Sequence, residues 1–261
     1  MRIFANKINR TNTFYSMRYG TILTLAAALM LASCQNKKNE EGGQTDETTS
    51  EQTVVKKNII KKRINILSDF NYLTNLGCID IIYTPGNYSI EVEGDSTTLT
   101  YLSTVFDSNL LTVSLKGDAN TGLNVYGNTS NVKMYISCPS LECVSVCSNG
   151  GFESQATWRG DNLQVGVLGT GAVNLATVEC TTFSLQSSNT GPFKIANLKA
   201  DDAVFMSTSS STIEANVDVK NLTVINEGKQ TMTFKGQALN TLVKNKKDPN
   251  LHLDLNTPVI K

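Results

Sequence analysis

The feature that most constrains the fold is a pattern that returns every 19 to 22 positions between residues 141 and 239. Small, turn-forming residues such as Gly169-Thr170-Gly171 and Asn189-Thr190-Gly191 separate its short alternating apolar runs. Short runs joined by tight corners at a fixed period predict the coils of a β-solenoid. Three apolar columns recur in four successive copies: Leu163, Phe183, Ala203 and Leu222; Val173, Phe193, Ile213 and Met232; Trp158, Val178, Leu198 and Val217.

Stacking of these coils predicts the position of the core. Equivalent inward residues of neighbouring coils are expected about 4.8 Å apart, with backbone groups paired between coils. Because no single coil can bury its own core, the two ends of the stack need covering. We expect residues 63–136, which read as strands throughout, to cap one end and residues 237–261 to cover the other. One interior ladder should consist of Phe152, Val173, Phe193, Ile213 and Met232.

The start of the chain is typical of an export signal. Arg18 precedes the apolar run 22–30, which suits a signal peptide but is too short to span a bilayer. The following Leu31-Ala32-Ser33-Cys34 resembles the lipobox of bacterial lipoproteins, so residues 1–33 are predicted to be removed and Cys34 to be lipidated. An ordinary signal peptide that happens to contain a cysteine is the alternative. Met1 and Met17 both remain possible starts.

The segment after the predicted anchor is polar, with almost nothing to bury. Residues 34–53 are therefore predicted to be a lipid anchor and flexible tether, and residues 54–261 a single domain. Acyl chains on Cys34 would hold the domain at a membrane, since each buried CH₂ contributes about 0.8 kcal/mol. We expect the bacterial cell envelope, with the outer membrane favoured and the periplasmic or cell-surface face left open.

Charge argues against a nucleic-acid partner. Removing residues 1–33 takes away four basic residues and no acid, which leaves 19 basic against 23 acidic residues and a net charge of −4. Nucleic-acid binding requires a basic patch or stripe, which this mildly acidic body lacks.

No catalytic, cofactor or metal site is predicted. His252 is the only histidine, placed in a lysine-flanked tail, so a catalytic triad would have one candidate base and no organised partner. Asp161, Asp201 and Asp202 are expected at solvated corners. Arg159 is the only arginine between residues 141 and 239, which disfavours a polysaccharide-lyase-like cleft. We predict no disulfide or metal site for the remaining cysteines, which are Cys78, Cys138, Cys143, Cys147 and Cys180.

Aromatic residues bear on sugar binding. All eight tyrosines precede residue 136, and the rings of the repeats occupy inward columns, so no row of exposed rings is expected on the solenoid. A glycan or protein ligand would then use a flat, hydrogen-bonding face, or else tyrosines near the N-terminal end for which packing is the favoured role. The first includes Gln164, Gly166, Ser184 and Gln186, and the second includes Tyr83, Tyr88 and Tyr126.

The order of motifs along residues 63–236 resembles the auto-transporter adhesin head GIN domain, a family of exported and lipid-anchored bacterial proteins. It is carried by Arg63, Phe70, Leu73, Gly77-Cys78-Ile79-Asp80-Ile81, Pro85-Gly86, Val92-Glu93-Gly94, Leu110-Leu111-Thr112-Val113, Pro139-Ser140-Leu141 and the corner Gly171-Ala172-Val173-Asn174. The resemblance implies a right-handed parallel β-helix and, by name only, adhesion. The glycine corner is lost at Ser209-Ser210-Ser211 and at Gly228-Lys229-Gln230.

Together these features predict an all-β solenoid with coils of about 20 residues and a β-rich N-terminal cap. The function that they favour is a lipid-anchored surface module that binds a partner without catalysis. A periplasm-facing structural lipoprotein is the alternative, and a carbohydrate-active β-helix enzyme is the less favoured third.

Overall fold

The computed structural model describes residues 58–116, 131–188, 190–244 and 249–256. The chain divides into two compact units, Met1–Val54 and Val55–Lys261, and every described residue belongs to the second. Within the described ranges the helical structure is a single 3-10 turn, η1 (Thr98–Tyr101), and no helix there is long and apolar enough to cross a membrane. The strands are β1 (Ile59–Arg63), β2 (Tyr72–Asn75), β3 (Ile79–Pro85), β4 (Ser89–Asp95), β5 (Leu102–Asp107), β6 (Leu110–Leu115), β7 (Val132–Cys138), β8 (Cys143–Val146), β9 (Phe152–Val167), β10 (Val173–Ser187), β11 (Phe193–Ser207), β12 (Thr212–Asn226), β13 (Thr231–Lys244) and β14 (Leu251–Asn256).

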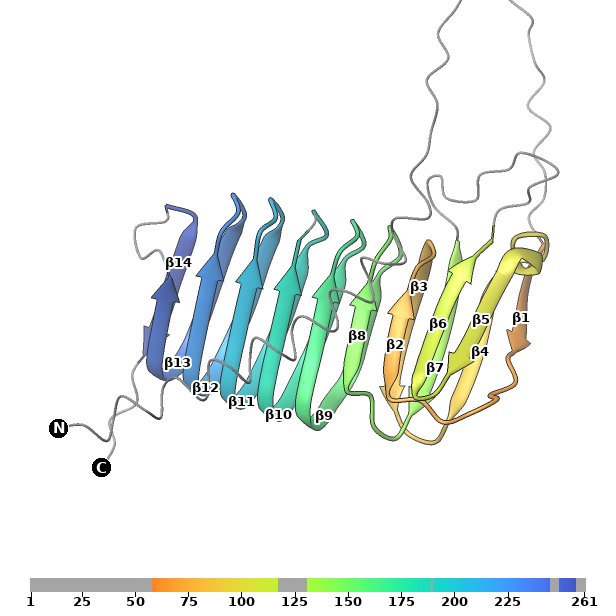
Figure 1. Ribbon diagram of the computed structural model, residues 1–261, viewed down its shortest axis with the longest axis horizontal. Coiled ribbons are helices and arrows are strands. Elements are labelled where there is room, and N and C mark those ends of the chain that lie inside the picture. Colours follow the sequence, from red (N-terminus) through yellow and green to blue (C-terminus); the bar gives the residue numbers. More distant parts are fainter. Residues whose placement is uncertain (1–57, 117–130, 189, 245–248, 257–261) are drawn as a thin grey trace, which may run out of the picture. The chain divides into compact units, whose positions relative to one another are not determined.

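Strands β9 to β13 are the repeating coils, and they lie side by side in Figure 1. Each coil is one strand of 14 to 16 residues that pairs in parallel with its neighbours. The predicted ladder is confirmed, because the pairing links Phe152, Val173, Phe193, Ile213 and Met232 in turn. All five side chains are at most 1% exposed, so each coil completes the core of the next.

The other two columns are also confirmed. Leu163, Phe183, Ala203 and Leu222 pair in register, as do Trp158, Val178, Leu198 and Val217, and all eight are buried. The short runs of each coil form one continuous strand rather than separate strands joined by corners, because the backbone stays paired with the next coil along nearly its whole length. The pairing of β9 with β10 is irregular at one point, between Leu175 and Thr177, and that of β11 with β12 is irregular between Ile195 and Leu198.

Each coil has a first half and a second half, which are Phe152–Trp158 and Leu163–Val167 in β9. Strand β3 pairs with the first half of β9, and β7, β4 and β1 follow beyond β3. Strand β8 pairs with the second half of β9, and β2, β6 and β5 follow beyond β8. The expectation that residues 63–136 form the N-terminal end of the stack is confirmed, and these strands extend both halves of the coils.

The N-terminal strands do not stack in chain order. Strand β2 pairs with β6 on one side and with β8 on the other, and β3 likewise pairs with β7 and β9. The segment 72–85 is therefore inserted between two segments that follow it in the sequence, 110–138 and 143–167 (Figure 1).

The C-terminal end differs from the expected cover. Strand β13 continues the repeat as far as Lys244, and β14 then pairs with the first half of β13, from Met232 to Gln237. Residues 237–244 thus belong to a coil, because their alternating apolar residues extend the interior columns, and β14 alone supplies the described cover. Residues 245–248 and 257–261 lie outside the described ranges.

Close backbone stacking explains the glycine corners. The backbone N–H of Gly171 donates to the Ser148 carbonyl (3.0 Å), and a Cβ on Gly171 would overlap the carbonyl oxygen of Gly150. Glycine is therefore required there for close approach rather than for an unusual φ.

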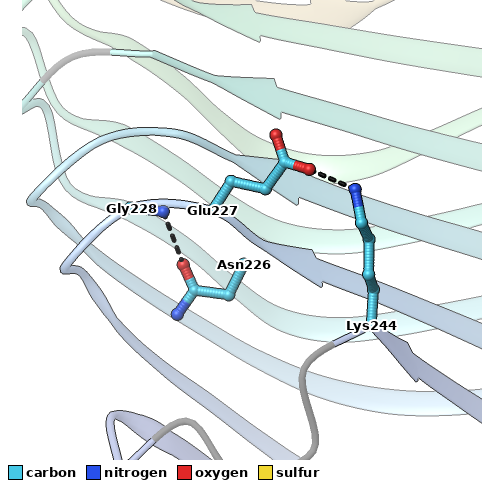
Figure 2. Close-up of polar contacts among 4 residues, drawn as sticks. All are labelled: Asn226, Glu227, Gly228 and Lys244. Atoms are coloured by element: carbon cyan, nitrogen blue, oxygen red, sulfur yellow. Dashed lines mark hydrogen bonds and ion pairs between the residues drawn. The ribbon is translucent and has the colours of Figure 1, made fainter.

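Where glycine is absent, buried polar side chains replace it. The Ser209 hydroxyl lies 3.1 Å from that of Ser207 and 3.3 Å from that of Ser211, and all three serines are buried. Asparagine side chains also bond to corner backbone groups at two other places: Asn75 accepts from the Gly77 N–H (3.1 Å), and Asn226 from the Gly228 N–H (3.2 Å; Figure 2).

Candidate functional site

One broad outward surface in the described part of the chain carries almost no charge. It is formed by β6, β2, β8 and the second halves of β9 to β13, whose side chains alternate between the core and solvent. We call it the neutral face. Its two outward rows are Leu110, Tyr72, Cys143, Gln164, Ser184, Val204, Thr223 and Leu242, and Thr112, Thr74, Ser145, Gly166, Gln186, Met206, Ile225 and Lys244.

Within the two rows Lys244 is the single charged residue, at the C-terminal border. Its ammonium group forms an ion pair with the Glu227 carboxylate of the adjacent corner (Figure 2). At the N-terminal end the Glu142 carboxylate borders the face, where it accepts a hydrogen bond from the Tyr72 hydroxyl (3.4 Å). Small side chains in the middle, at Cys143, Ser145 and Ser184, are only 7–8% exposed. Much of the accessible part of the face therefore comes from longer neighbours, which include Tyr72, Gln164, Gln186, Val204, Met206, Thr223, Ile225 and Leu242.

The four residues predicted for a flat, hydrogen-bonding surface lie together on this face. Gln164 pairs in register with Ser184, and Gly166 with Gln186. The sequence reasoning missed that the next two coils continue the surface with apolar residues, Val204, Met206 and Ile225. The sequence contains a pattern that could have predicted this, because these uncharged positions alternate with the buried column residues and therefore face outward.

The outward surface of the first halves differs sharply in charge. Its row from β9 to β14 contains Glu153, Lys194 and Glu214, and the Lys194 ammonium lies 3.8 Å from the Glu214 carboxylate. At the bend between the two halves, Arg159 pairs with Glu179 at 2.9 Å. Such exposed pairs contribute at most about 1 kcal/mol each to stability, but their charges stay hydrated. The neutral face loses less hydration free energy when a partner covers it.

A shallow groove of about 480 Å³ follows the bend between the two halves. Its floor is Cys180, Ala200 and Val219, and charged residues of both signs form its walls. Burial raises the pKa of the Cys180 thiol to about 12, so this sulfur stays protonated at neutral pH and is a poor nucleophile. The walls consist of Glu179, Lys199, Asp218, Asp201, Lys220 and Leu239.

Three of the other described cysteines also have thiols that stay protonated at neutral pH. Cys78, Cys138, Cys143 and Cys147 are free thiols, as is Cys180. Burial raises the pKa of Cys138, Cys143 and Cys147 to about 11 in each case. Within the described ranges no group of three or more His, Cys, Asp or Glu side chains is placed to hold a metal ion.

The acidic corner residues pair with neighbouring coils. Asp201 forms an ion pair with Lys220 (2.8 Å), and Asp202 accepts a hydrogen bond from the Asn221 amide (2.7 Å). Asp161 is exposed, as expected for a solvated corner. These contacts occupy the carboxylates that a cation would need.

His252 lies in strand β14, so its assignment to a tail was wrong, although its side chain is exposed as expected. Tyr83 is buried and donates to the Cys138 carbonyl (3.3 Å), and burial raises its pKa above the usual value. Tyr88 donates to the Phe70 carbonyl (3.4 Å). Both tyrosines pack, in agreement with the favoured role. Tyr126 and Cys34 lie outside the described residues.

These features define the class of protein as a parallel β-solenoid whose described part presents one charged and one neutral outward surface. The family described as "Putative auto-transporter adhesin, head GIN domain" matches residues 69–196 of the chain. The predicted resemblance is thereby confirmed.

A solved structure supports the fold. The chain is similar to an adhesin-named protein of Bacteroides fragilis, with 17% identity, a TM-score of 0.53, and coverage of 77% of this chain and 96% of that chain. It is also similar to a protein of Parabacteroides distasonis named as lipid binding, with 14% identity, a TM-score of 0.48, and coverage of 78% and 96%. No curated protein sequence matches the chain.

Proposed function

We propose that this protein is a lipid-anchored module of the bacterial cell envelope that binds an uncharged partner surface through its neutral face, without catalysis. The observation that carries this proposal is the contrast between the two outward surfaces. A flat area of amides, hydroxyls and aliphatic groups offers hydrogen bonds and apolar contact at a low cost of desolvation. Two similarities support the binding role and the envelope location. One is the match to a family whose description names an adhesin, and the other is the fold shared with a solved structure that is also named an adhesin.

Absence of reactive groups at the neutral face supports binding over catalysis. Its cysteine, Cys143, has a pKa raised to about 11 by burial, and its lysine is engaged by Glu227. Catalysis needs a nucleophile or a proton-transfer group whose pKa suits its task, and the protonated thiol of Cys143 does not meet that need at neutral pH.

The anchor is testable separately from the binding face. In the native host, Cys34→Ser should abolish incorporation of labelled palmitate and release the domain from the membrane fraction. Cys180→Ser is the matched control, because that cysteine lies in the folded domain. Protease treatment of intact cells then distinguishes the two faces of the membrane: digestion of the domain supports surface display, and protection favours the periplasm-facing structural role.

A glycan array spanning neutral and acidic oligosaccharides tests the binding role with residues 54–261, which include the whole second compact unit. We expect binding to neutral oligosaccharides, its loss in Met206→Lys, and its retention in Lys194→Glu, because only the first change places a charge on the neutral face. Silence across the array contradicts a glycan ligand. Binding that both variants retain contradicts the assignment to this face.

A further inference from the structure

The two ends of the stack are protected to different degrees. At the N-terminal end, the outermost strand β1 carries Lys61, Lys62 and Arg63, and all five of its residues are exposed. Lysine and arginine on an edge strand discourage pairing with another chain. At the C-terminal end, β14 is the outermost strand of the described sheet, and it pairs on one side only, with β13.

Strand β14 presents apolar side chains that its own chain leaves incompletely covered in the described structure. Its register places Leu251, Leu253 and Leu255 above Met232, Phe234 and Gly236, which places the leucines on the interior side. Phe234 is fully buried, whereas Leu253 is 42% exposed and Leu251 and Leu255 are partly exposed. A solenoid end that leaves apolar residues exposed and an edge strand unpaired tends to associate with another chain.

The sequence of β14 is complementary to itself. Residues 251–255 read Leu-His-Leu-Asp-Leu, so the strand has the same pattern of apolar residues in either direction, with a hydrogen-bond donor, His252, on one side of Leu253 and an acceptor, Asp254, on the other. His252 and Asp254 are exposed and lie opposite Thr233 and Lys235, on the outward surface.

We propose that β14 pairs antiparallel with β14 of a second copy of this chain, about a two-fold axis through Leu253. Directly opposite residues of an antiparallel pair lie on the same surface. Leu253 then meets its equivalent, Leu251 meets Leu255, and His252 meets Asp254 at both symmetry-related positions. The interior leucines of the two copies form one continuous core, and an isologous interface closes at two copies.

This arrangement bears on the neutral face. The axis is perpendicular to the sheet that contains β14, so the charged surfaces of both copies point to one side and both neutral faces to the other. Two equivalent surfaces side by side raise the avidity for a repetitive partner without any new contact. The pairing itself does not depend on the proposed ligand, because it is read from β14 alone.

Full-length copies carrying two different epitope tags in the 35–53 segment, co-expressed and solubilised in detergent, test the pairing by co-purification. We expect wild-type copies to co-purify. His252→Asp copies should lose self-association because the introduced carboxylate would face Asp254 of the other copy. Asp254→Lys copies should lose it because the carboxylate that accepts a hydrogen bond from His252 of the other copy is replaced by an ammonium group, which cannot accept one. Both positions are exposed, so neither change removes buried packing.

The decisive sample mixes the two variants. In this mixture, the carboxylate introduced by His252→Asp in the first variant lies opposite the ammonium group introduced by Asp254→Lys in the second, and Asp254 of the first lies opposite the unchanged His252 of the second. Neither position then holds two like charges, so the mixture should regain co-purification. Asp107→Lys, at the far end of the stack on β5, should behave as wild type. Wild-type copies that fail to co-purify overturn the proposal, as do single variants that associate normally or a mixture that does not regain association.

Discussion

Replacing Gly171 by alanine tests the close stacking of corners most directly. Its Cβ would overlap the Gly150 carbonyl oxygen, an atom of the backbone that cannot rotate away. Overpacking costs about 1–3 kcal/mol, and a rigid obstacle favours the upper part of that range. Separating the corners also weakens the hydrogen bond from the Gly171 N–H to Ser148 (3.0 Å), worth about 1 kcal/mol. We therefore expect a loss of about 3 kcal/mol in the free energy of unfolding.

The chain supplies its own control at Gly166. A Cβ there would meet the Leu168 Cδ1 atom at 3.4 Å, an ordinary contact, so Gly166→Ala should change stability by less than about 0.5 kcal/mol. In a domain of this size the loss at Gly171 corresponds to a fall of about 6–12 °C in Tm. Urea and thermal unfolding followed by circular dichroism measure both variants. Equal stability of the two would refute the argument from backbone contact.

Three further changes probe the interior and its titration. Phe193→Asp buries a charge in the ladder and should abolish the cooperative thermal transition, whereas Lys194→Asp should not; an unchanged melt for the first would contradict the inward column. Asn226→Ala should cost about 1–3 kcal/mol in urea unfolding because the Gly228 N–H loses its acceptor, and a neutral result would show that the corner does not need it. The native pKa of Cys180 is about 12, against an ordinary value of 9.0, so the protonated buried thiol contributes its full stabilisation below pH 9 and loses it as the pH rises towards 12. Cys180→Ala should therefore make Tm decline less steeply between pH 9 and 12. An unaltered slope would count against the buried thiol.

Periodicity was enough to predict the coils because every column position repeats the same physical requirement. Phe193 and Val173 face the interior for the same reason, so a 20-residue interval between them specifies which backbone atoms pair. The corners were less predictable. Ser209 replaces glycine by a hydroxyl that bonds to Ser207, a solution that a search for glycine alone does not find.

The neutral face was only half predictable for a related reason. Gln164 and Gln186 lie in the repeats, and their neighbours follow from the period. Tyr72 and Thr74 join the same surface because β2 is inserted between β6 and β8, a pairing between segments 38 to 71 positions apart that no period encodes. The open edge at β14 likewise depends on where regular stacking ends, which composition does not specify.

The insertion of β2 also sets an order of events during synthesis. A chain that emerges from its N-terminus presents Leu73 long before Leu111 and Val144, the two residues between which it must be placed. Closing such long loops is slow, whereas each later coil adds to a template about 20 residues behind it. The edge of β2 that pairs with β8 therefore has to remain unpaired until residue 146 has been synthesised, long after its other edge can pair with β6.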